Sequence, residues 1–436
     1  MKLKYYSLAV ALNLLVALPS QANDPFSELD KEIEQLSVDD SAEFEQWYTN
    51  QIKEFNQWQQ AYLADWDKKQ QASIKKWGDA KIPSPDVIVV YDEQHDARTV
   101  VDLDKGEITV SYLPSDEVKS ANPEQEAQIV NSVIESNAPL WQEVGLVTPQ
   151  KAAPQAVYVE EIKVEAKTFE QVKQEIEAQT ERQMSQLDMF AEKQAAVISP
   201  YKQEQIIAEQ KVAMQKRQAQ RVAKVEKQLK LQQATFETKP QQVVAYTVKI
   251  PESALSDRAS QYLPTVQKES LKRQLQPSLV LAIMHTESHF NPRAKSHVPA
   301  YGLMQIVPTT AGHDVNKLYR GKDKPMKVND LYDPTVNIET GAAYLKILQS
   351  RYLKGIKDPQ SATYSVIAAY NTGSGNVAKA FGEKSVSSAV KKINSMSSEQ
   401  VYQHLIRNLP YKETRNYLKK VNDRMKTYHA QSNSII

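Results

Sequence analysis

The sequence predicts an α+β chain in which a small antiparallel sheet and long helices precede an all-helical C-terminal part. Alternation of apolar and polar residues, typical of strands, occurs at residues 86–113, 156–164 and 241–251. Apolar residues at helical spacing dominate from Thr168 to about Lys239 and again from Pro251 onward. Glycine is unevenly spread, with three before residue 250 and eight after residue 300, which marks at least one domain boundary.

The overall composition excludes some classes of partner. A chain of 436 residues is long enough for two or more domains. Its 54 Lys and Arg against 53 Asp and Glu give a net charge of +1, so no global field attracts nucleic acid or anionic lipid. The sequence has no cysteine to carry an acyl chain, so we expect no lipid anchor. We expect no cofactor.

The first residues predict a signal peptide. Lys2 and Lys4 form a basic start, residues 8–18 are apolar, and Ser20-Gln21-Ala22 fits a cleavage site for small residues. The apolar run is too short for a membrane-spanning helix. We therefore expect residues 1–22 to be removed after about Ala22 and the protein to be exported and soluble. The alternative is a buried helix of the mature fold.

Residues 23–250 are predicted to form an accessory α+β domain. Residues 24–80 have helix-like spacing, and strands follow in "DVIVVYD" and "RTVVDLDKGEITVSYL", where Asp104-Lys105-Gly106 has the composition of a hairpin turn. The segments "AVYVEEIKV" and "QQVVAYTVKIP" predict further strands. Together these runs favour a small antiparallel sheet with helices packed on it.

A long helical segment, residues 168–239, interrupts these strands. Thr168 and Gln171 fit a capping box, and Pro200 is expected to break or kink the helix. The apolar stripe favours a hairpin of two helices, whose Gln, Glu, Lys and Arg residues form a solvated face. A coiled coil that binds a partner is the alternative.

Residues 251–430 are predicted to form an all-helical domain. Within "PSLVLAIMHTESHFNP", Pro277 suits the first helical position. Glu287 lies seven residues after Val280 and four after Ile283, so it shares the apolar face of this helix. An unpaired buried carboxylate is costly, and such a residue is usually paired, protonated or used in chemistry.

Two other motifs, a possible zinc helix and a possible dinucleotide-binding loop, match their patterns only in part. His285 and His289 flank Glu287, but a zinc helix of the H-E-x-x-H type needs its Glu directly after the first His, so we expect no metal. The segment "NTGSGNVA" follows a helical run rather than a strand, so a turn leading into a helix is favoured over a dinucleotide loop.

The C-terminal part resembles a known family. A carboxyl whose pKa is raised by apolar surroundings can protonate the leaving oxygen of a glycosidic bond. The segments "ESHFNPRAKSHVPAYGLMQIVP", "AAYNTGSGNV" and "PYKETRNYLKKV" resemble, in order and spacing, the signatures of the lysozyme-like (Slt-type) lytic transglycosylases. The resemblance is close from Leu279 to Asn376 and continues to about Tyr428.

The resemblance implies a lysozyme-like catalytic domain and a set of site residues. Glu287 matches the single catalytic acid and base. The matched substrate-binding residues are Ser288, Ser296, Gly302, Met304, Gln305, Tyr370, Asn371, Glu413 and Tyr417. From the residues alone, Tyr370 and Tyr417 are also plausible core aromatics, and Glu413 a helix charge.

The resemblance also implies a reaction on peptidoglycan in the periplasm. A single carboxylate requires the substrate to supply its own nucleophiles: the N-acetyl group of MurNAc assists cleavage, and its C6 hydroxyl closes a 1,6-anhydro ring. The alternatives are a lysozyme-type hydrolase and a non-catalytic glycan-binding scaffold. A cell-wall protein partner for the N-terminal domain is a further hypothesis.

Overall fold

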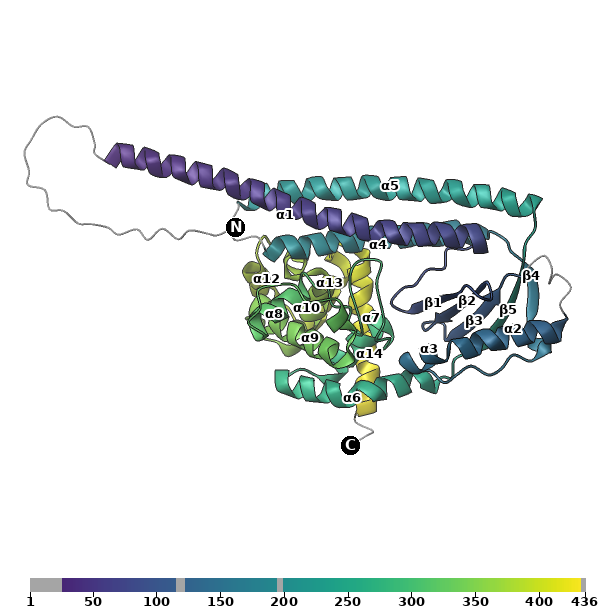
Figure 1. Ribbon diagram of the computed structural model, residues 1–436. Coiled ribbons are helices and arrows are strands. Elements are labelled where there is room, and N and C mark those ends of the chain that lie inside the picture. Colours follow the sequence, from purple (N-terminus) through teal and green to yellow (C-terminus); the bar gives the residue numbers. More distant parts are fainter. Residues whose placement is uncertain (1–25, 115–121, 194–198, 433–436) are drawn as a thin grey trace, which may run out of the picture.

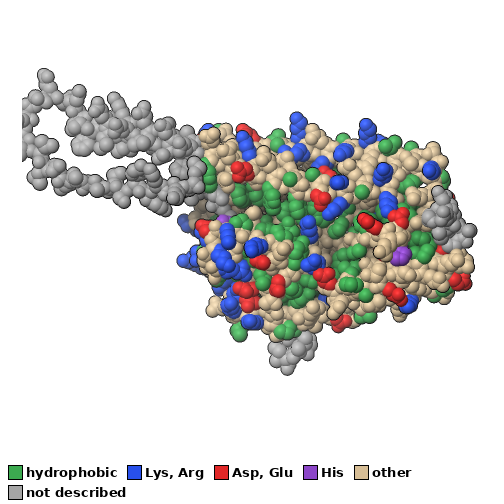
Figure 2. Space-filling model, in the orientation of Figure 1, with side chains coloured by type: hydrophobic (Ala, Val, Ile, Leu, Met, Phe, Trp, Pro, Cys, Tyr) green, Lys and Arg blue, Asp and Glu red, His purple; other side chains and the backbone are tan. Residues whose placement is uncertain are grey.

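The computed structural model describes residues 26–114, 122–193 and 199–432 (Figure 1). The predicted signal peptide lies outside the described residues. None of the described helices combines the length and the apolar character needed to cross a bilayer. Figure 2 shows Lys, Arg, Asp and Glu side chains distributed over this face of the molecule, in keeping with a net charge near zero.

A five-stranded sheet forms in the N-terminal region, and every neighbouring pair is antiparallel, which confirms the prediction. The strands are β1 (Val87–Asp92), β2 (Ala97–Asp102), β3 (Glu107–Tyr112), β4 (Tyr158–Glu161) and β5 (Gln242–Lys249), in the order β1-β2-β3-β5-β4. Gly106, at φ 64°, ends the turn between β2 and β3. On the other side of β3, β5 pairs with it and also with β4, where Glu161 lies opposite Gln242.

Short helices cover one face of this sheet. They are α2 (Pro123–Ser136), α3 (Ala138–Glu143) and the 3-10 turn η1 (Pro154–Ala156). Ile134 of α2 packs with Val110 and Val244, and Trp141 of α3 packs with Val101 and Ile108. The alternating strand residues that the sequence pattern singled out therefore bury one side of the sheet.

Three long helices lie side by side along one edge of the molecule (Figure 1). They are α1 (Phe26–Trp77), α4 (Ala166–Lys193) and α5 (Pro200–Thr238). The predicted pair of helices is thus present, and α5 begins at Pro200, with Ser199 accepting a hydrogen bond from the Lys202 backbone N–H. The predicted capping box was wrong: α4 begins at Ala166, so Thr168 lies inside its first turn.

The predicted solvated face of the long helices is also wrong for much of α4. Gln179, Gln186 and Asp188 are between 2% and 9% exposed. They are buried because α4 lies between the other two long helices and the C-terminal helices. Gln59 Nε2 of α1 donates to Gln186 Oε1 at 3.0 Å, and Arg221 Nη2 of α5 donates to Gln179 Oε1 at 2.6 Å.

The C-terminal part is helical, as predicted, and shares one large apolar core. Its elements are α6 (Ser253–Arg273), α7 (Pro277–Ser288), α8 (Ala311–Tyr319), η2 (Asn329–Tyr332), α9 (Pro334–Ile347), the π-turn η3 (Leu348–Tyr352), α10 (Pro359–Thr372), α11 (Ser374–Ala380), α12 (Val386–Ile393), α13 (Ser398–Asn408) and α14 (Lys412–Ser432). The division into domains at residue 250 stays a prediction.

Candidate active site

Glu287 lies in the last turn of α7. The helix begins at Pro277, in the predicted first position, and ends at Ser288 because His289 and Phe290 adopt left-handed backbone conformations, at φ 49° and 61°. The apolar side of α7 packs into the core of the C-terminal helices, and α14 packs along α7. Glu287 is carried on this buried side and is only 5% exposed.

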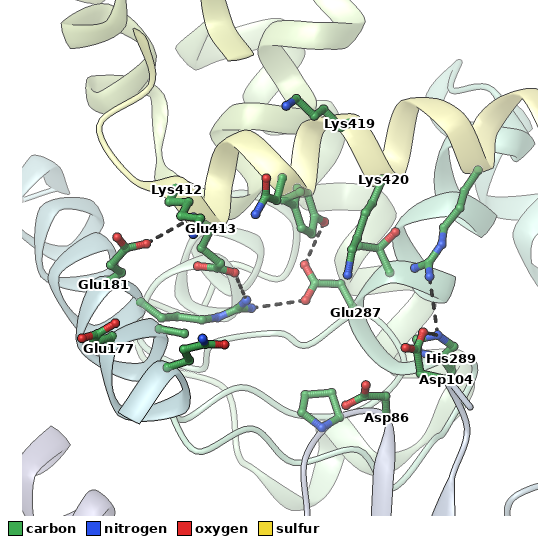
Figure 3. A pocket seen from close by; sticks show the side chains of 18 of the residues that line it. Asp86, Asp104, Glu177, Glu181, Glu287, His289, Lys412, Glu413, Lys419 and Lys420 are labelled. Atoms are coloured by element: carbon green, nitrogen blue, oxygen red, sulfur yellow. Dashed lines mark hydrogen bonds and ion pairs between the residues drawn. The ribbon is translucent and has the colours of Figure 1, made fainter. Parts of the chain in front are cut away.

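Both carboxylate oxygens of Glu287 accept hydrogen bonds (Figure 3). The hydroxyl of Tyr417, on α14, donates to Oε1 at 2.8 Å. Arg182 Nη2, on α4, donates to Oε2 at 3.2 Å. Burial raises the pKa of Glu287, although the charge of Arg182 and the Tyr417 hydrogen bond act in the opposite direction. A buried carboxyl with a raised pKa is suited to donating a proton near neutral pH.

Arg182 joins Glu287 to a second carboxylate. Its Nη1 donates to Glu413 Oε1 at 2.6 Å, and the same oxygen accepts from Asn371 Nδ2 at 3.1 Å. Burial disfavours the Arg182 charge, but Glu413 and Glu287 outweigh it and raise its pKa. Glu181 Oε2 accepts from the backbone N–H of Glu413 at 3.2 Å. The site is therefore built from α4, α7, α10 and α14 together.

A pocket of about 840 Å³ opens beside this network. Glu287, Arg182, Glu413 and Tyr417 line it (Figure 3). Its remaining wall combines acidic residues of α4 and of the sheet loops with basic residues of α14. These are Glu170, Glu177, Glu181, Asp86 and Asp104 on the acidic side, and Lys412, Lys419, Lys420 and Arg424 on the basic side.

The predicted residues next to Glu287 form a buried support rather than a pocket wall. The Ser288 hydroxyl donates to the carbonyls of Met284 and Leu303, at 3.1 and 2.7 Å, and so joins α7 to the turn at residues 301–306. The Tyr370 hydroxyl donates to the Met304 carbonyl at 2.8 Å. Both side chains are less than 8% exposed and neither lines the pocket.

The turn at residues 301–306 is held by Asn337. Asn337 Oδ1 accepts from Met304 N at 2.8 Å, and its Nδ2 donates to the carbonyls of Tyr301 and Leu331. Gly302 has φ 74° in this turn. The turn contacts α7 at Ser288, the residue after Glu287. Met304 is fully buried in the core.

Gln305 and Ser296 lie in the same loop region. Gln305 Nε2 donates to the carbonyls of Ala294 and Gly302, whereas its buried Oε1 has no hydrogen-bond partner among the described residues. The Ser296 hydroxyl accepts from Val298 N at 3.2 Å. Gln305 therefore has a spare acceptor, and Ser296 is 2% exposed.

Sequence reasoning missed Arg182. The residue sits in the polar stretch "QTERQMSQ", which has the composition of a solvated helix, and 105 residues separate it from Glu287. Of the two histidines that flank Glu287, His289 lines the pocket, with Nε2 3.3 Å from Asp104 Oδ1. His285 does not line it, and its Nδ1 is 3.0 Å from the Tyr428 hydroxyl. The described residues contain no group of three His, Cys, Asp or Glu side chains placed to hold a metal ion.

Residues 264–393 match the family model described as the transglycosylase SLT domain. The matched stretch contains Glu287, the turn at 301–306 and Asn371, and it ends before Glu413 and Tyr417. Within the C-terminal helical part, residues 264–393 are therefore identified as a transglycosylase SLT domain. The Slt-type resemblance predicted from the three signatures is confirmed.

Curated relatives of the SLT domain include proteins named membrane-bound lytic murein transglycosylase C. The protein from Serratia proteamaculans (strain 568) is 47% identical over 190 residues, which are 43% of this chain and 52% of that protein. The protein from Sodalis glossinidius is 46% identical over 187 residues, with the same coverage of each chain. The chain thus spans about half the length of the curated relatives it matches.

One solved structure is also similar in sequence. It is an inactive mutant of lytic transglycosylase Slt from Pseudomonas aeruginosa, 29% identical, with 39% of this chain and 24% of that chain covered and a TM-score of 0.30.

Proposed function

We propose that this protein is a peptidoglycan lytic transglycosylase, which cleaves the β-1,4 bond between MurNAc and GlcNAc without water. The observation that carries the proposal is the buried carboxyl of Glu287, held by Tyr417 at the edge of a pocket of about 840 Å³ in an SLT domain. The names of the relatives, lytic murein transglycosylases, support the same chemistry.

Glu287 acts first as the general acid. Its proton goes to the glycosidic oxygen, and the GlcNAc leaves as an alcohol while the N-acetyl carbonyl oxygen of MurNAc attacks C1. The raised pKa of Glu287 keeps this proton available. Tyr417, which donates to Oε1, fixes the carboxyl so that Oε2 is the oxygen directed at the substrate.

Glu287 then acts as the general base. The ionised carboxylate takes the proton of the MurNAc C6 hydroxyl, whose oxygen attacks C1 and displaces the N-acetyl oxygen. The product is a 1,6-anhydro ring, and Glu287 is protonated again. Because both reacting groups belong to one sugar, proximity replaces a bimolecular encounter, an effect on the order of 7 kcal/mol in good cases.

In this proposal, the other site residues either bind the glycan or support Glu287 and the neighbouring loop. Gln305 offers its unpaired Oε1 to a sugar hydroxyl or amide, and Asn371 and Glu413 hold the network around Glu287. Tyr370 and Ser288 act structurally, because their hydroxyls already bond to backbone carbonyls. Ser296, Gly302 and Met304 shape the loop beneath the sugar.

Mass spectrometry of the muropeptides released from purified sacculi by residues 23–436 tests the function. We expect products that are lighter by one water than hydrolysis products and that end in 1,6-anhydroMurNAc. Glu287→Gln protein serves as the control for contaminating enzymes. Reducing-end products from the wild type would refute the transglycosylase reaction.

The second candidate is a lysozyme-type hydrolase, and one observation favours it. Ordinary glycosidases use two carboxylates, and Glu413 shares the Arg182 guanidinium with Glu287. Sequence reasoning had found no second acid close to the motif. In this reading Glu413 would position a water molecule, and the same mass spectra would show reducing ends.

We also propose that the protein acts in the periplasm after export. The proposal rests on the basic, apolar and small-residue segments of the first 22 residues and on the location of peptidoglycan. A cell-wall protein partner for the region before residue 250 stays a hypothesis.

The rate of product release should fall as the pH rises through the pKa of Glu287, because only the protonated carboxyl can serve as the acid. Burial raises this pKa, Arg182 and Tyr417 lower it, and Glu413 raises it. Arg182→Gln removes a cation, so it should raise the pKa of Glu287 further. The alkaline limb of the pH–rate profile, where the rate falls with rising pH, should then move to higher pH. Initial rates measured across pH for both proteins, with sacculi well below saturation so that the rates report the pKa of the free enzyme, check this expectation.

Arg221→Gln is the matched control for this comparison. Arg221 is also partly buried and ion-paired, but its partner is Asp67, in the layer of long helices. Its substitution should leave the alkaline limb in place. A limb that stays unchanged or moves to lower pH in Arg182→Gln would show that another group governs it.

A further inference from the structure

Helix α4 occupies the position at which the proposed reaction must begin. In the proposed acid step, the glycosidic oxygen has to approach Oε2 of Glu287, and in the structure this oxygen accepts from Arg182 at 3.2 Å. A guanidinium only donates hydrogen bonds and stays charged, so it can neither relay the proton nor coexist with the leaving oxygen at this atom. Arg182 also lowers the pKa of Glu287, against the larger effect of burial, and so disfavours the protonated form that the acid step needs.

The same helix continues over the Tyr370–Asn371 segment. Ser185 Oγ lies 3.0 Å from Thr372 Oγ1 and 3.3 Å from the carbonyl of Asn371. Met189 belongs to the core cluster of the SLT domain and covers Gly373 so closely that a Cβ there would lie 2.8 Å from Met189 Cγ. The segment predicted to line a glycan cleft therefore lies beneath α4.

One turn further, α4 covers the start of α11. The Glu192 carboxylate accepts from the Gly375 backbone N–H at 3.1 Å and from the Ser374 hydroxyl. Asp188 accepts from Asn376 Nδ2 at 3.0 Å and from the Tyr411 hydroxyl at 2.7 Å. Apart from Met189, and from Tyr411, which packs in an apolar cluster with Met184 and Leu187 of α4, the contacts described here are polar or charged.

The polar character of this interface indicates that it can open. Groups such as Arg182, Asp188 and Glu192 regain hydrogen bonds from water when they separate, so opening costs less than it would at an apolar interface of the same size. The SLT domain keeps its own apolar core when α4 leaves, because Met189 is the one residue of α4 in that core cluster.

We propose that α4 is an autoinhibitory helix, and that a glycan strand reaches Glu287 only after α4 separates from the SLT domain. This inference rests on the proposed function. In the closed state Arg182 takes the place of the leaving oxygen, and the stretch from Ser185 to Glu192 covers the segment from Asn371 to Gly375. In the open state Glu287 is freed from the cation and the cleft is exposed.

A reversible crosslink tests the inference directly. The natural chain has no cysteine, so Ser185→Cys with Thr372→Cys introduces a single possible disulfide between α4 and α10. The two hydroxyl oxygens are 3.0 Å apart, which is compatible with disulfide geometry. Thr109→Cys with Thr247→Cys is the matched control: these oxygens are 3.1 Å apart on paired strands of the sheet, away from the SLT domain.

Release of anhydromuropeptides from sacculi is measured for each protein before and after reduction with dithiothreitol. We expect the oxidised Ser185→Cys, Thr372→Cys protein to be at least about tenfold slower than its reduced form, and the control pair to be unaffected by oxidation. Equal rates for the oxidised and reduced forms of the α4–α10 pair would overturn the inference, since a fixed α4 would then be compatible with turnover.

A binding measurement keeps the inference separate from the proposed function. If the reduced proteins and the wild type release nothing, the proposed function fails. Binding of purified glycan strands to the oxidised and reduced forms then decides about α4: tighter binding by the reduced form supports the covering role, and equal binding refutes it.

Discussion

The Glu287→Gln variant should release anhydromuropeptides about 10²- to 10⁴-fold more slowly than the wild type, the range expected when a general acid is lost. Glutamine has nearly the shape of a protonated glutamate but has no proton to give to the leaving oxygen. Its amide oxygen can accept from Arg182, and its amide nitrogen can donate to Tyr417, so the buried network keeps its partners. Initial rates on sacculi measure the loss of activity, and the thermal unfolding midpoint shows whether the fold keeps its stability.

The matched control is Glu383→Gln. Glu383 pairs with Lys392 in the same domain, at 2.6 Å, and does not line the pocket. This variant should keep wild-type activity. The assignment of Glu287 would be contradicted by activity close to wild type in Glu287→Gln, or by unfolding of that variant, because the carboxyl would then have no chemical role or a mainly structural one.

Gly302→Ala should lower the free energy of unfolding by about 3 kcal/mol or more. Gly302 has φ 74°, and a Cβ at this position would lie 2.3 Å from the Leu331 carbonyl oxygen and 2.4 Å from Asn337 Nδ2. The new methyl group would be strained by its backbone conformation and would also displace the Asn337 side chain that holds the turn. Urea denaturation of both proteins, followed by circular dichroism, gives the difference.

Gly321→Ala separates the steric effect from the backbone effect. Gly321 has φ 64°, but a Cβ there would meet nothing within 4 Å. Its substitution should cost only about 1 kcal/mol, the usual cost of placing a side chain at positive φ. If both alanine variants lost the same stability, the crowding around Gly302 would not be the cause.

Local patterns in the sequence were enough to predict the sheet and the position of Glu287. The alternation in β1, β2 and β3 and the turn ending in Gly106 depend on neighbouring residues, and the burial of Glu287 follows from its spacing to Val280 and Ile283.

The partners of Glu287 were harder to predict. The signature resemblance brought Tyr417 into the site but left open whether it was a core aromatic; the structure shows that it is buried and bonded to Glu287. Nothing in the sequence around Arg182 distinguishes it from a solvated arginine, because its burial depends on how α4 docks on helices far along the chain.

The register of β4 and β5 defines how α4 and α5 are attached to the rest of the protein. Glu161 and Gln242 face each other in adjacent antiparallel strands, so the chain leaves the sheet and returns to it at the same place. In topological terms, everything between these two residues is the loop of a single β-hairpin, although it contains two helices of 28 and 39 residues. The two helices are consequently joined to the sheet covalently at one end only, while noncovalent contacts with α1 and with the C-terminal helices hold the rest of α4, including Arg182 beside Glu287.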